Sequence, residues 1–132
     1  EKVRILGPVR GRTQVEILAG DSFKLGIKPT AKLSGDLDGT PGVTIIGPKG
    51  SVQTKEGVMV AQRHIHMLPE DAARLGVHDG QNVSLEVDGI RGGVLRNTIV
   101  RVTSQSGLEC HVDTEEANAM GLSSSSRVRI VQ

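Results

Sequence analysis

Two histidines separated by a single residue are the first feature of this sequence with the chemistry of a site. They lie in Arg63-His64-Ile65-His66, within a stretch rich in valine, isoleucine and methionine. On a β-strand, residues i and i+2 project from the same face, so His64 and His66 would present their imidazoles side by side. Two imidazoles form half of a metal site. A histidine pair of this kind can equally be structural or simply exposed.

A third histidine occupies a related position. The segments that begin at His66 and His111 match without a gap at a constant offset of 45 residues, and the match covers residues 66–85 and 111–130. Chance similarity between two turn-helix-turn segments is the alternative to a true repeat. A pseudo-two-fold axis would bring equivalent positions together, so that three imidazoles converge on one ion. Three histidine ligands with an open fourth position are typical of a catalytic zinc site.

Short strands must position these residues. Segments rich in β-branched and aliphatic residues recur along the chain, at 13–18, 43–46, 58–67, 82–87, 94–103, 108–113 and 127–131. Two short helices are predicted at 69–75 and 114–120, each with acidic residues in its first turn and a glycine directly after it. The sequence therefore predicts a mainly β fold with short helices, in which small β-barrels contain an internal pseudo-two-fold repeat.

Three further side chains could do chemistry. Glu16 shares a strand face with Gln14, either as a solvent-facing carboxylate or as a metal ligand or general base. Arg10 lies in a loop shaped by glycine and proline, where it is either simply exposed or able to bind phosphate. Cys110 precedes His111, but adjacent strand residues point to opposite faces, which favours a small buried apolar side chain over a nucleophile.

Composition excludes several classes of function. The 16 basic and 15 acidic residues nearly cancel, which disfavours a strongly electrostatic nucleic-acid binder. One phenylalanine, without tryptophan or tyrosine, leaves little for base stacking. A single cysteine excludes an intrachain disulfide. No apolar run approaches the roughly 20 residues of a membrane span.

The chain resembles PduL-type phosphotransacylases, also called phosphate propanoyltransferases. Five motifs carry the resemblance in chain order: Gly-Pro-x-Arg-x-x-Thr-Gln-Val-Glu at 7–16, Ser-Gly-Asp-x-x-Gly-x-Pro-Gly at 34–42, Gly-Val-x-x-Ala-x-Arg-His-Ile-His-Met at 57–67, Glu-Asp-Ala-x-x-Leu-Gly-Val at 70–77 and His-x-Asp-Thr-x-Glu-Ala-Asn at 111–118. Together these motifs extend over nearly the whole chain.

The resemblance implies an enzyme that interconverts acyl-CoA and phosphate with acyl phosphate and CoA. It implies two β-barrel subdomains. Residues 1–57 would form the remainder of the first barrel with connecting loops, and residues 58–132 would form the second barrel. It also implies two zinc ions per complete enzyme. By this resemblance, His64, His66 and His111 would bind one metal, and Glu16 would bind the other. Arg10 would bind the phosphate. The CoA site would be lined by Arg4, Leu6 and Asn118, together with His111.

The chain also departs from the family pattern, because it lacks the N-terminal segment that carries another His-x-His motif. We therefore expect this chain to supply most of the ligands of one metal site. We also expect it to form a homo-oligomer or to associate with the missing N-terminal segment. The expected location is the cytoplasm or the lumen of a bacterial microcompartment, with no nucleic acid or membrane as partner. Two alternatives remain open: a metal-dependent thioester hydrolase, and a non-enzymatic barrel that dimerises or binds a partner.

Overall fold

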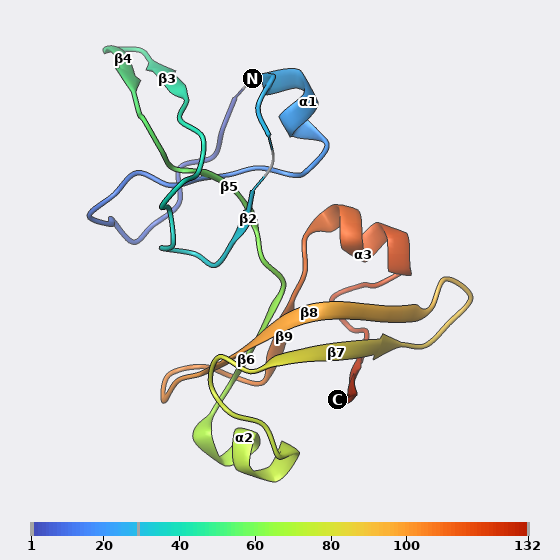
Figure 1. Ribbon diagram of the computed structural model, residues 1–132. Coiled ribbons are helices and arrows are strands. Elements are labelled where there is room, and N and C mark those ends of the chain that lie inside the picture. Colours follow the sequence, from blue (N-terminus) through green and yellow to red (C-terminus); the bar gives the residue numbers. More distant parts are fainter. Residues whose placement is uncertain (1, 29, 132) are drawn as a thin grey trace. The chain divides into compact units, whose positions relative to one another are not determined.

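Short strands dominate the architecture (Figure 1), and three short helices accompany them in the part of the chain described. The computed structural model describes residues 2–28 and 30–131. The mainly β fold with short helices is thereby confirmed. The chain divides into two compact units, residues 1–60 and 61–132. Within the described residues, no helix has the length and apolar character needed to cross a membrane.

The first unit contains a small sheet and a separate hairpin. In the sheet, β1 (Val15–Glu16) runs parallel to β5 (Val58–Ala61), and β2 (Ala31–Lys32) lies on the other side of β5. Strands β3 (Thr44–Gly47) and β4 (Gly50–Gln53) form the antiparallel hairpin. Helix α1 (Asp21–Leu25) lies between β1 and β2 in the sequence. Val58 and Met59 are each 1% exposed, so β5 forms the core of this unit.

The second unit is a five-stranded sheet with the order β10-β7-β8-β6-β9. These strands are β6 (His64–Met67), β7 (Asn82–Val87), β8 (Gly93–Val102), β9 (Glu109–His111) and β10 (Arg129–Val131). Only the β6–β8 pairing is parallel among the ladders of this sheet in the described residues. Buried and half-buried residues alternate along β6 and β7 as the two-residue period of a strand requires. The core therefore gathers on one face, around Ile65, Met67, Leu85 and Val100.

The internal repeat is visible in the local structure of this unit. Helices α2 (Pro69–Leu75) and α3 (Thr114–Met120) are 45 positions apart, and each ends at a left-handed glycine, Gly76 with φ 68° and Gly121 with φ 66°. The turns that follow are equivalent as well: the N–H of Gln81 donates to the carbonyl of His78 at 3.1 Å, and that of Ser126 to the carbonyl of Ser123 at 3.0 Å. The helix, its glycine stop and the next turn are thus copied together.

Strand pairing obeys the same two-fold symmetry. In the β6–β9 ladder Ile65 lies opposite Cys110, its own repeat equivalent. In the β7–β10 ladder Leu85 likewise lies opposite its equivalent, Ile130. A pseudo-two-fold axis therefore relates β6 to β9 and β7 to β10. Strand β8, which lies between β6 and β7, has no described counterpart between β9 and β10, so the curled sheet is an open half-barrel in the described residues.

Several elements differ from the sequence prediction. The strand predicted at 58–67 is two strands, β5 and β6, which belong to different sheets and are separated by Gln62 and Arg63. Strands β2 and β4 and helix α1 were not predicted. Helix α1 has only five residues, too few for a recognisable 3.6-residue pattern.

Candidate metal centre

Three histidines meet on one face of the second sheet. Strand β6 contributes His64 and His66, and the neighbouring strand β9 contributes His111, which lies directly opposite His64 in the ladder. One ring nitrogen from each lies within 4.8 Å of the others. The ring centroids of His64 and His111 are 5.0 Å apart in a stacked arrangement, and His66 stands edge-on to both. The convergence predicted from the repeat is therefore present in the fold.

Hydrogen bonds orient the two histidines of β6. The Nδ1 atom of His64 lies 2.8 Å from the carbonyl oxygen of Gln62. Because a carbonyl only accepts, Nδ1 carries the proton of neutral His64 and Nε2 keeps its lone pair. This Nε2 faces the Nε2 of His66 at 3.2 Å. On its far side, His66 Nδ1 lies 3.4 Å from the hydroxyl of Ser106. Both Nε2 atoms thus point into the same space.

The electrostatics favour the neutral form of His66. Burial lowers the pKa of His66, and the neighbouring His64, His111 and Arg101 lower it further, while Glu109 acts in the opposite direction. A neutral imidazole is the form that ligates metals. The Nε2 separation also suits a shared ion, since two nitrogens bound to a tetrahedral zinc lie about 3.3 Å apart. The residues present therefore fit a metal held by three nitrogen ligands.

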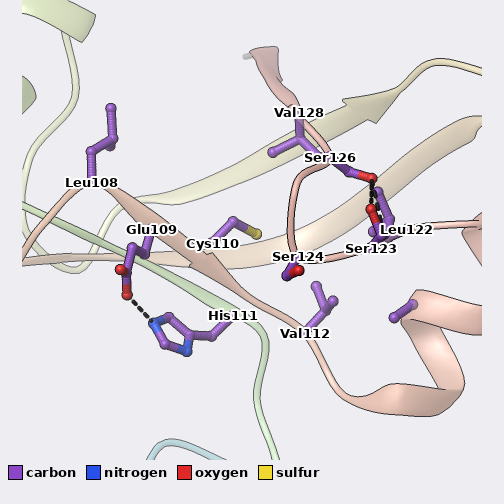
Figure 2. Close-up of a pocket in the computed structure, with 11 residues that line it drawn as sticks. Leu108, Glu109, Cys110, His111, Val112, Leu122, Ser123, Ser124, Ser126 and Val128 are labelled. Carbon is purple, nitrogen blue, oxygen red and sulfur yellow. Dashed lines mark hydrogen bonds and ion pairs between the residues drawn. The ribbon is translucent and has the colours of Figure 1, made fainter.

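A cavity of about 570 Å³ opens beside His111 (Figure 2). It is lined by β9, by the turn after α3 and by Val128, and its wall includes Cys110 and His111. The side chains of these two residues leave β9 on opposite sides (Figure 2). Burial raises the pKa of the Cys110 thiol to about 11; Glu116 raises it further and Arg63 opposes the shift. The thiol packs against the apolar core and is poorly suited to act as a thiolate nucleophile.

The remaining candidate residues are divided between the two units. Arg4, Leu6 and Arg10 lie in the exposed N-terminal segment of the first unit, and Asn118 lies exposed on α3 of the second. Glu16 is exposed on β1.

The carboxylate of Glu16 is held by Gln14, which directly precedes β1. The amide Nε2 of Gln14 donates to Glu16 Oε1 at 2.7 Å and to the hydroxyl of Ser34 at 3.0 Å. The amide oxygen of Gln14 accepts the N–H of Gly35 at 2.8 Å. Gln14 therefore links Glu16 to the loop that carries the motif at 34–42.

Sequence reasoning missed two residues beside the histidines. Glu109 lies opposite His66 in the ladder, with a carboxylate oxygen 3.5 Å from His111 Nε2 (Figure 2). Glu109 is the repeat equivalent of His64, so the offset of 45 applied to His64 would have found it. Ser106 lies in a connection outside the repeat, where we see no sequence signal for its contact with His66.

Comparisons with known proteins identify the family of this chain. The family model described as phosphate propanoyltransferase matches residues 1–123. The chain is 55% identical over 129 residues to the phosphate propanoyltransferase of Rhodobacter capsulatus, covering 98% of the chain and 60% of that protein. It is 49% identical over 133 residues to the phosphate propanoyltransferase of Thermotoga maritima, covering all of the chain and 63% of that protein. The chain thus spans about three-fifths of the length of these curated relatives. On this similarity, the chain belongs to the phosphate propanoyltransferase family.

Proposed function

We propose that this chain carries a zinc-containing part of the active site of a phosphate acyltransferase. The enzyme would interconvert a short-chain acyl-CoA and inorganic phosphate with acyl phosphate and CoA. The observation that carries the proposal is the convergence of His64, His66 and His111, with one ring nitrogen from each within 4.8 Å. Membership in the phosphate propanoyltransferase family supports the choice of reaction.

In this reaction a phosphate oxygen attacks the thioester carbonyl, the C–S bond breaks, and CoA leaves as its thiolate. A zinc ion held by the three histidines would supply Lewis acidity at this carbonyl or at the phosphate. The guanidinium of Arg10 would bind phosphate in a bidentate manner and offset the repulsion between the phosphate and the other anions of the site. Within the second unit, Asn118 and His111 would contribute to the CoA site.

A second zinc in the complete enzyme would be bound in part by Glu16. The support is the hydrogen bond from Gln14 Nε2 at 2.7 Å, which fixes one oxygen of this exposed carboxylate. A ligand that is already oriented loses less freedom when it binds a metal. The other ligands of that ion would come from outside this chain.

We also propose that the second unit associates through the edges of its open sheet. Strand β8 pairs in parallel with β6 and antiparallel with β7. The two-fold symmetry makes β9 and β10 the equivalents of these two partners, and the cavity of about 570 Å³ lies along β9 and reaches Val128 beside β10. A strand from a second copy, or from the remaining two-fifths of a full-length protein, would pair with both edges and close the barrel.

The test is the metal content of the purified chain, measured by elemental analysis. We expect about one zinc per chain, and its loss in His64→Ala. His78→Ala is the matched control, because His78 is an exposed turn residue outside the cluster and its removal should leave the zinc in place. Retention of zinc in His64→Ala, or equal loss in both variants, would contradict the proposed site.

The reaction is tested separately by the release of CoA from propanoyl-CoA. A phosphate acyltransferase requires phosphate or arsenate for this release, whereas a thioester hydrolase does not. The assay is run on the chain alone and on the chain combined with the remainder of a full-length relative. Release independent of both anions would favour the hydrolase.

A further inference from the structure

Arg63, directly before the first histidine of the cluster, connects three elements of the second unit. Its Nε lies 2.7 Å from Glu116 Oε1 on α3. Its Nη1 donates to the carbonyl oxygen of Arg96 on β8 at 2.7 Å. The side chains of Arg63 and Glu116 are only 25% and 20% exposed, so solvent screens this ion pair less than one on the surface. One planar guanidinium thus spans from a strand to a helix.

On the side of the helix, the ion pair of Arg63 with Glu116 lies close in the chain to His111, the third histidine. Glu116 belongs to the capping box of α3: its backbone N–H donates to the Asp113 carboxylate at 2.7 Å, and its Oε2 accepts the N–H of Asp113 at 3.3 Å. The two carboxylate oxygens of Glu116 therefore hold Arg63 and the start of the helix at the same time. Asp113 follows His111 by two residues, so this network fixes the chain where it leaves the metal centre.

On the side of the sheet, the hydrogen bond of Arg63 to the Arg96 carbonyl lies at an irregularity in β8. Asn97 has φ 57°, a left-handed conformation, and the β7–β8 register shifts opposite it, between Val83 and Leu85. The carbonyls of Arg96 and Asn97 accept hydrogen bonds from Arg63 and from the amide of Gln62. Gln62 is the residue whose own carbonyl orients His64. The bulge therefore fixes the chain where it enters β6.

The repeat shows that this connection is not a general requirement of the fold. At the repeat equivalents of Arg63 and Glu116 stand Leu108 and Asp71. Asp71 pairs instead with Arg74 of its own helix, at 2.6 Å. Leu108 carries no charge, so the equivalent ion pair with Asp71 cannot form, and helix α2 folds without it. The connection described for Arg63 therefore belongs to α3, the helix that follows His111.

We propose that Arg63 is a positioning residue of the metal centre, which holds His111 against His64 and His66 through its ion pair with Glu116. This inference rests on the proposed function, because it assumes that the three histidines bind a metal. Arg63 does not itself contact the ion. Its role is to keep the two strands and α3 at the separation at which all three rings ligate together.

The test measures cobalt(II) binding to the metal-free chain by visible absorption, since cobalt reports its coordination number through the intensity of its d–d bands. We expect Arg63→Met to weaken cobalt binding about 10- to 100-fold, the range typical for partners that orient metal ligands, and to lower the band intensity. Glu116→Gln should weaken it less, because its amide oxygen can still cap α3.

Arg129→Met is the matched control. It removes a different Arg–Glu ion pair of the second unit, that of Arg129 with Glu86 at 2.9 Å, together with the longer contact of Arg129 with Asp88 at 3.7 Å. Neither pair has a described contact with the histidines. Cobalt affinity should then stay within about threefold of the unmodified chain, as expected for an exposed ion pair. If both arginine variants lose affinity equally, the effect is a general one on the sheet and the inference is wrong.

Arg63→Lys keeps the experiment decisive if Arg63→Met fails to fold. Lysine keeps the charge but cannot hold Glu116 and the Arg96 carbonyl with one planar group, so an intermediate loss of affinity and of band intensity is expected. Cobalt binding equal to that of the unmodified chain, in a folded Arg63 variant, would overturn the positioning role and leave the metal centre intact. Cobalt binding unaffected by His64→Ala would instead overturn the metal centre, and the inference with it.

Discussion

At the residue scale, the chemistry of Cys110 depends on the strand face from which its side chain projects. Burial raises the pKa of its thiol to about 11. At pH 8 this leaves about a hundredfold less thiolate than an ordinary cysteine has, and the thiolate is the reactive form. We therefore predict that Ellman's reagent reacts at least about a hundredfold more slowly with the folded chain than with the chain in guanidinium chloride. Equal rates in the two states would place Cys110 outside the core.

Protonation of His66 makes the stability of the metal-free chain depend on pH. Its pKa is lowered mainly by burial, so the unfolded chain binds a proton at this position at a higher pH than the folded chain does. Below the ordinary histidine value of about 6.5, protonation therefore favours the unfolded state, and the stability conferred by neutral His66 is lost as the pH falls.

We predict that the urea midpoint of the metal-free chain decreases between pH 7.5 and pH 5.5. His66→Gln, which cannot titrate, should reduce the slope. A midpoint that rises on acidification, or a slope unchanged in His66→Gln, would contradict this prediction.

At the scale of elements, Gly57 determines how closely β1 approaches β5. Its φ is 124°, and a Cβ at this position would lie 2.4 Å from the carbonyl oxygen of Thr13. Its own carbonyl accepts the N–H of Val15 at 2.8 Å, next to Glu16. Only glycine adopts this conformation without strain and also permits the close contact.

We predict that Gly57→Ala lowers the free energy of unfolding of the first unit by at least about 2 kcal/mol. The control is Gly11→Ala, where an added Cβ meets no atom within 4 Å, and the change should stay within about 0.5 kcal/mol. Equilibrium denaturation measures both variants. Equal stabilities would show that β1 can move away from β5 without cost.

At the scale of the whole molecule, repeated sequence does not produce repeated environments. Leu85 and Ile130 are equivalent positions and face each other across the β7–β10 ladder. Leu85 is fully buried because β7 lies between two strands, whereas Ile130 is only partly buried on the edge strand β10.

We predict that Leu85→Ala lowers the free energy of unfolding by about 2–5 kcal/mol, as expected for a large buried side chain. Ile130→Ala should cost less than half as much, because its side chain loses fewer contacts. Urea denaturation at low protein concentration measures the difference. If a strand closes the barrel between β9 and β10, the cost of Ile130→Ala should increase with the concentration of the partner that supplies it.

Local sequence patterns predicted the two helices next to the histidine strands, and their duplication. Helices α2 and α3 and their glycine stops were predictable because capping and termination act within a few residues. The histidine pair of β6 was predictable because side chains alternate along a strand, and the constant offset of 45 predicted that His111 would join it. The five motifs similarly identified the family.

The long-range contacts around those residues could not be predicted, because they form between segments far apart in the sequence. No local sequence pattern predicts four of these features. They are the division of 58–67 between two sheets, the bulge at Asn97, the contact of Ser106 with His66, and the ion pair of Arg63 with Glu116. Each depends on strand register and on the distance between elements. Register is set by burying one face of the whole sheet together, a property of packing that no single segment contains.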